Sequence, residues 1–77
     1  MSKDKDDILK KIAERCKQLR KERNFTSGET FAYAKGLNRS QYGKYEAGSI
    51  DMQITSLEKV IKAYGISVKE FFSEGFD

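Results

Sequence analysis

The residue types best suited to chemistry gather in one segment, Asn38-Arg39-Ser40-Gln41-Tyr42-Gly43-Lys44-Tyr45-Glu46-Ala47-Gly48. At about 100° per residue, a helix from about Arg39 to Glu46 turns both tyrosines and the glutamate to one side. The other side is small, polar and basic, and consists of Ser40, Gly43, Lys44 and Ala47, with Arg39 at the flank. Guanidinium, ammonium and hydroxyl groups donate hydrogen bonds to base edges such as O6 and N7 of guanine. We therefore expect this face to approach a nucleic acid closely, with Gly43 leaving the room to do so.

A tight turn, Lys35-Gly36-Leu37-Asn38, positions this helix. Gly36 can adopt the left-handed conformation that ends a preceding helix. Asn38 can accept hydrogen bonds from the first free N–H groups of the next helix, and Leu37 is an apolar plug between the two. Two helices joined by a turn of about three or four residues that contains Gly form a helix-turn-helix, here over about residues 26–48. An ordinary αα-hairpin has the same turn and remains the alternative.

Two helices are predicted before this turn. The first, from about Asp6 to Arg23, begins with carboxylates that suit a helix N-terminus. Its apolar residues recur at helical spacing and are Ile8, Ile12, Cys16 and Leu19, widened by Leu9 and Ala13. The second helix is capped by Thr26 or Ser27 and directs Phe31 and Ala32 to the core. For Tyr33 we expect partial burial, with a hydroxyl contact to a phosphate as the alternative.

Two helices are also predicted after the turn. The first, from about Ile54 to Tyr64, has an apolar stripe made of Ile54, Leu57, Val60, Ile61 and Tyr64, and Gly65 ends it. Ser67 caps a short last helix from Val68 to about Phe72 or Ser73. The tail carries many large apolar groups for its length, namely Ile66, Val68, Phe71, Phe72 and Phe76. They form either a dimer surface or a packed C-terminal core, and both alternatives stay open.

Composition limits the fold and the class of function. The 77 residues allow one domain, and the absence of Pro and of strand-like alternation indicates an all-α fold. A charged segment follows Met1, and no apolar run is long enough to span a membrane, so we expect a cytoplasmic protein. Cys16 is alone and there is no His, which excludes a Cys/His zinc site and an intrachain disulfide. We expect no cofactor, no metal, no small-molecule ligand and no enzymatic activity, because no acid pair accompanies a nucleophile.

Charge is distributed unevenly along the chain. The net charge is +3, but residues 9–23 carry seven basic and two acidic groups, whereas residues 49–77 carry three basic and five acidic groups. Such asymmetry predicts a basic face for a polyanion and an acidic rear, although a lysine-rich helix in solvent has the same composition.

Four segments in order resemble the phage-repressor/Cro-like (XRE-type) helix-turn-helix family. Besides the turn and residues 38–48, they are Leu19-Arg20-Lys21-Glu22-Arg23 and residues 57–72, so the resemblance covers about residues 8–72. It implies a compact five-helix bundle of the lambda-repressor type, with residues 1–77 as a single domain and an ordered core over about residues 6–73. It also implies a sequence-specific regulator of transcription that binds double-stranded DNA as a homodimer. A protein-interaction module, or the antitoxin of a toxin–antitoxin pair, is the alternative on the same fold.

The residues and the resemblance together assign roles at this expected interface. The third helix would enter the major groove, and its base-contacting residues would be Arg39, Ser40, Gly43 and Lys44. Phosphates would be held by Arg15, Ser27, Gly28, Lys35, Gln41 and Ser49, which fix the register without reading sequence. The family also implies a buried ion pair between Arg20 and Glu46, since an inward carboxylate needs a partner.

Overall fold

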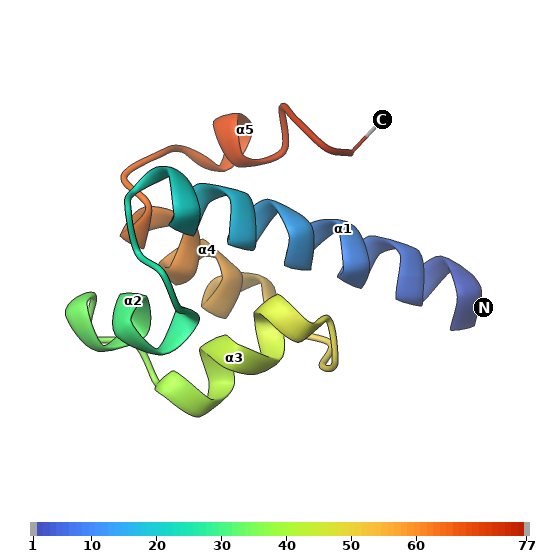
Figure 1. Cartoon of the computed structure of the whole chain (residues 1–77). Helices are drawn as coiled ribbons and strands as arrows, with labels where there is room; N and C mark the ends of the chain where they lie inside the picture. Colours follow the sequence, from blue (N-terminus) through green and yellow to red (C-terminus); the bar gives the residue numbers. More distant parts are fainter. Residues whose placement is uncertain (1, 77) are drawn as a thin grey trace.

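A computed structural model describes the backbone of residues 2–76 and the side chains of residues 6–76. Within that range the chain forms five helices and no strand: α1 (Ser2–Glu22), α2 (Gly28–Ala34), α3 (Arg39–Ala47), α4 (Ile54–Ala63) and α5 (Val68–Phe71). The long α1 runs through the middle of the molecule, with α2 and α3 on one side of it and α5 on the other (Figure 1). The expected all-α bundle of five helices is confirmed.

Helix α1 departs from the prediction at its start and in the face that it buries. It begins at Ser2 rather than about Asp6, while Met1 lies outside the described residues. Leu9 is buried, whereas Ile8 is 43% exposed, so placing Ile8 on the core stripe was wrong. The reason lies in α3, because a Cβ built on Gly48 would be 3.4 Å from the Leu9 carbonyl oxygen and 3.6 Å from the Ala13 Cβ. The end of α3 therefore covers the side of α1 that bears Leu9 and Ala13.

An aromatic cluster fills the space between the helices. The Phe31 ring lies 5.0 Å from the Tyr64 ring and 5.2 Å from the Tyr42 ring, measured between centroids. Phe71 continues the stack, at 6.4 Å from Tyr64. These four side chains are at most 3% exposed and come from α2, α3, α5 and the C-terminal end of α4. The burial of these rings packs α2, α3, α4 and α5 against one another.

The turn between α2 and α3 has the geometry that its sequence predicts. Gly36 has a φ of 70°, the Leu37 N–H donates to the Ala32 carbonyl at 2.8 Å, and the Gly36 N–H donates to the Tyr33 carbonyl at 3.3 Å. These are the two hydrogen bonds of a Schellman helix end. Asn38 then caps α3 by accepting from the Gln41 N–H at 2.8 Å. The turn is thus held by local bonds on both sides, which fixes the angle at which α3 leaves α2.

The C-terminal apolar residues divide between core and surface. Phe71 is fully buried, and Phe72 and Phe76 pack against it with ring centroids at 5.0 and 5.9 Å. Val68 is 43% exposed, and Ile54 is 71% exposed, so its assignment to the α4 core stripe was wrong. Ile54 is the first residue of α4 and borders a surface hollow beside Val68 and Phe72 rather than the core. Within residues 2–76, no helix combines the length and the apolar character that crossing a membrane requires.

Candidate nucleic-acid interface

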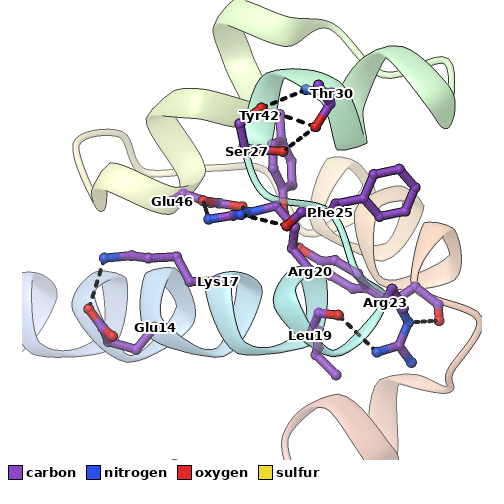
Figure 2. Close-up of polar contacts among 11 residues, drawn as sticks. Glu14, Lys17, Leu19, Arg20, Arg23, Phe25, Ser27, Thr30, Tyr42 and Glu46 are labelled. Carbon is purple, nitrogen blue, oxygen red and sulfur yellow. Dashed lines mark hydrogen bonds and ion pairs between the residues drawn. The ribbon is translucent and has the colours of Figure 1, made fainter.

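The inward side of α3 is fixed to α1 by an ion pair. Arg20 donates from Nε to Glu46 Oε2 at 2.8 Å and from Nη2 to Glu46 Oε1 at 3.0 Å, which makes the pair bidentate (Figure 2). Its Nη1 donates to the Phe25 carbonyl at 2.9 Å. The Arg20 and Glu46 side chains are only 7% and 12% exposed. The hydrogen bonds to the Glu46 carboxylate stabilise the charged guanidinium and raise the pKa of Arg20. This pair, expected from the sequence, holds α1, α3 and the segment before α2 together.

A second polar contact fixes α3 to α4. The hydroxyl groups of Tyr42 and Tyr64 are hydrogen-bonded at 2.7 Å within the core. Burial raises the pKa of both phenols, and it raises the pKa of the neighbouring Cys16 thiol to about 11. All three groups are therefore neutral at physiological pH, and Cys16 belongs to the core rather than to any reactive site.

The outward side of α3 is free of such contacts. Arg39, Ser40, Gly43 and Lys44 are all exposed, and a Cβ built on Gly43 would meet nothing within 4 Å. An open cleft of about 470 Å³ lies between the start of α2 and α3 and is lined by Gly28, Glu29, Arg39, Ser40, Gly43 and Glu46. The structure thus gathers the expected base-contacting residues on one accessible face.

The start of α2 forms one rim of this cleft. Ser27 caps the helix by accepting from the Thr30 N–H at 3.1 Å. A Cβ built on the next residue, Gly28, would lie 3.3 Å from the Tyr42 ring and 3.4 Å from the Glu46 carboxyl group. Gly28 therefore allows α2 to pack closely on α3, a structural role that its place as an expected phosphate contact did not reveal.

The other expected phosphate contacts lie around α3. Lys35 is exposed at the end of α2. Gln41 is on the opposite flank of α3 from Arg39, where it lines a hollow of about 160 Å³ together with Lys59. Ser49 is exposed just after α3, and its hydroxyl donates to the Lys44 carbonyl at 3.4 Å. All three are exposed; Gln41 and Ser49 lie beside Ser40 and Lys44, and Lys35 precedes the turn that leads into α3.

Arg15 does not belong to this surface. It is 6% exposed, and its Nε donates to the Phe71 carbonyl at 2.7 Å while its Nη2 donates to the Glu70 carbonyl at 2.8 Å. A cation at these carbonyls satisfies the C-terminal end of α5. Its donors are directed into the protein, so the assignment of Arg15 as a phosphate contact is corrected: the residue clamps α5 onto α1.

Two lysines of α1, Lys17 and Lys21, lie on the side of that helix next to α3 and were not among the predicted site residues. Lys17 and Lys21 continue at four-residue spacing the row that begins with Ala13, which is the side of α1 next to α3. Lys17 is half-buried and pairs with Glu14 at 3.1 Å, and Lys21 is exposed (Figure 2 shows Lys17). The excess of basic residues over residues 9–23 was visible in the sequence. Only the packing of α3 on α1 shows which of these lysines lie on the side of α1 next to α3.

Tyr33 also differs from the expectation. Partial burial was predicted, yet the side chain is 77% exposed and its ring faces Arg39, whose Cζ lies 6.0 Å from the ring centroid. The core position in α2 is already filled by Phe31 and Ala32, which leaves Tyr33 on the outer side.

Comparison with known proteins shows the family of the chain. Residues 17–71, most of the chain, match the helix-turn-helix family. The chain belongs to that family. This helix-turn-helix protein is also similar to control protein C.MunI of a Mycoplasma species, at 35% identity over 69 residues that cover 90% of this chain and 93% of the relative. No solved structure matches the chain.

The XRE-type resemblance is thereby confirmed, and the helix-turn-helix protein is a DNA-binding regulator. Neither comparison favours the alternative of a protein-interaction module or an antitoxin.

Proposed function

We propose that α3 of this regulator enters the major groove of double-stranded DNA and reads its sequence with Arg39, Ser40, Gly43 and Lys44. One observation carries the proposal: α3 has two different sides. Its inward side is fixed by the Arg20–Glu46 pair and the Tyr42–Tyr64 bond, and its outward side is exposed and rich in donors. Arg39 and Lys44 donate to guanine O6 and N7, Ser40 pairs with several base edges, and Gly43 permits close approach.

We further propose that a ring of residues around α3 holds the phosphates. It consists of Ser27 and Gly28 at the start of α2, Lys35 at its end, Gln41 and Ser49 beside α3, and Lys17 and Lys21 on α1. Contacts of this kind supply affinity and register and weaken with salt. Lys17 and Lys21 take the place that Arg15 held in the sequence prediction.

The regulator is proposed to act as a homodimer. Ile54 and Val68, both exposed, and the half-buried Phe72 line a largely apolar hollow of about 190 Å³ between α4 and α5. A second copy related by a two-fold axis would cover these residues and place the two α3 helices about 34–36 Å apart, one turn of duplex. Glu58 and Lys62 flank the hollow on α4, where charges can fix the register of the partner.

The dimer is tested by sedimentation at micromolar concentration. Ile54→Lys should give monomers, because it places a charge in the interface, while the matched change Ile8→Lys on α1 should leave the dimer intact. Both residues are exposed, so both variants should keep the wild-type melting temperature. A wild-type protein that stays monomeric and binds DNA as a monomer would reject the homodimer.

The biological setting follows by analogy. The relative at 35% identity is named a control protein, and we propose the same kind of role here, a cytoplasmic transcriptional regulator that works as one domain without catalytic activity. The reading face is tested with Arg39→Ala and Lys44→Ala. Each should weaken binding to the specific site by about 1–3 kcal/mol and leave stability within about 0.5 kcal/mol of wild type. If both variants bind specific and random duplexes as the wild type does, α3 is not the reader.

A further inference from the structure

Tyr33 is a large aromatic residue that the fold does not use. Its side chain is 77% exposed, the largest exposed fraction of any large apolar or aromatic residue among residues 6–76. It belongs to α2, whose buried side is supplied by Phe31 and Ala32. A residue of this type on the outer side of the helix next to the reading helix has no role in stability that the structure shows.

Arg39 is the residue that Tyr33 faces. The Arg39 Cζ lies 6.0 Å from the Tyr33 ring centroid, within the range in which the negative face of an aromatic ring attracts a guanidinium. Among residues 6–76, the Arg39 side chain takes part in no ion pair and no hydrogen bond. Glu29 lines the same two hollows as Arg39 without pairing with it. The ring of Tyr33 is therefore the contact that restricts where this long side chain points.

We propose that Tyr33 is a specificity-determining positioning residue. Its ring orients the Arg39 guanidinium so that the two donors of Arg39 face a guanine in the major groove. The inference rests on the proposed reading role of α3. An arginine reads O6 and N7 of guanine with two parallel donors, so its discrimination depends on the orientation of a planar fork. A free arginine loses side-chain entropy when it adopts that orientation, and a ring already in contact reduces the loss.

The proposed role of the Tyr33 ring differs from that of a hydroxyl group that binds phosphate. A hydroxyl that bound phosphate would add the same affinity to every sequence. A ring that orients Arg39 adds affinity only where Arg39 has a guanine to bind, and nothing once Arg39 is removed. The ring without its hydroxyl should therefore suffice.

The experiment is a set of binding titrations with wild type, Tyr33→Phe, Tyr33→Leu, Arg39→Ala and the double variant Tyr33→Leu/Arg39→Ala. The duplexes are the selected site and copies with single base-pair changes, and the base pair that Arg39 reads is the one whose preference Arg39→Ala loses. Tyr33→Leu should reduce discrimination at that base pair by about two- to fivefold, the range of an exposed cation–π contact. Tyr33→Phe should keep the wild-type discrimination, and Tyr33→Leu should change nothing further in the Arg39→Ala background.

Lys44 supplies the matched control. It follows Arg39 by five positions, which places it about 140° further around α3, so Tyr33→Leu and Lys44→Ala should act additively. All variants should melt with the wild type because Tyr33 and Arg39 are exposed. The contact itself is measured by NMR in the absence of DNA. The chemical shifts of the Arg39 δ-protons should lie upfield in the wild type relative to Tyr33→Leu, because the ring current of Tyr33 shields them.

Three results would overturn the proposal. They are a uniform loss of affinity in Tyr33→Leu on all duplexes, a Tyr33→Phe variant that behaves as Tyr33→Leu does, and Arg39 δ-protons that do not shift. A wild-type protein that binds all duplexes equally would instead reject the proposed function, and with it this inference.

Discussion

Replacing Arg20 by Ala tests the contact that positions the whole reading helix. The guanidinium makes three hydrogen bonds, two to Glu46 at 2.8 and 3.0 Å and one to the Phe25 carbonyl at 2.9 Å. Arg20→Ala leaves the Glu46 carboxylate with 12% exposure and no cation, and it leaves the Phe25 carbonyl without this donor. Both groups then lack the hydrogen bonds that Arg20 supplied, and alanine offers nothing that offsets their loss of hydration.

The expected loss is large for so small a protein. Removing one partner of a buried pair costs about 3–5 kcal/mol, while a domain below about 80 residues rarely has more than about 3–5 kcal/mol of net stability. At about 4–8 °C per kcal/mol, the melting temperature should fall by at least about 12 °C. A substantial fraction of Arg20→Ala should therefore be unfolded at 25 °C, and DNA binding should fall in proportion.

The assay is urea unfolding followed by helical circular dichroism. Lys21→Ala is the matched control, because it removes an exposed cation from the next position of α1 and should stay within about 0.5 kcal/mol of wild type. The double variant Arg20→Ala/Glu46→Ala should be less destabilised than the sum of the single changes, since no charge is left buried. An unfolding free energy of Arg20→Ala within about 1 kcal/mol of wild type would refute the role given to the pair.

Four further outcomes are expected. Tyr42→Ala should destabilise the fold by about 3–5 kcal/mol, whereas Tyr42→Phe, which keeps the ring and loses the hydroxyl bonded to Tyr64, should cost about 1 kcal/mol; equal losses in urea titrations would contradict this. The Cys16 thiol should not react with a thiol reagent at pH 7.5 until the protein unfolds, and rapid native labelling would place it outside the core. Burial raises the pKa of the Cys16 thiol from 9.0 to about 11. The contribution of the buried thiol to stability should therefore be complete below about pH 9 and decline as the pH rises toward 11, which melting curves from pH 7 to 11 measure. Lys17→Ala and Lys21→Ala should each weaken binding to all duplexes and reduce the salt slope by about one unit, and a loss confined to one sequence would assign them to bases instead.

Local signals were the part of the fold that the sequence predicted well. The caps at Ser27, Asn38 and Ser67 and the left-handed Gly36 each depend on a few neighbouring residues, and all occur as expected. The inward tyrosines of α3 followed from helical periodicity for the same reason. The start of α1 was less well defined, because acidic residues suitable for a helix N-terminus occur at several positions before Ile8.

Contacts between distant residues were the part that the sequence did not predict. Arg15 bonds to carbonyls 55 and 56 positions further on, and nothing in its neighbourhood distinguishes it from a lysine or arginine in solvent. Ile8 and Leu9 fit the same apolar stripe until the end of α3 covers one of them. The exposure of Tyr33 likewise depends on how α2 packs, so its relation to Arg39 became visible only in the assembled bundle.

Selection of bound sequences from a random duplex pool tests the central claim, that α3 is a sequence reader, most directly. The wild-type protein should enrich a palindrome whose half-sites have centres one helical turn apart, about 10–10.5 base pairs, with a guanine required in each half-site. The pool bound by Arg39→Ala should lose the preference at one base pair of each half-site and keep the rest. A wild-type pool without any enriched sequence, or an Arg39→Ala pool identical to that of the wild type, would contradict the claim.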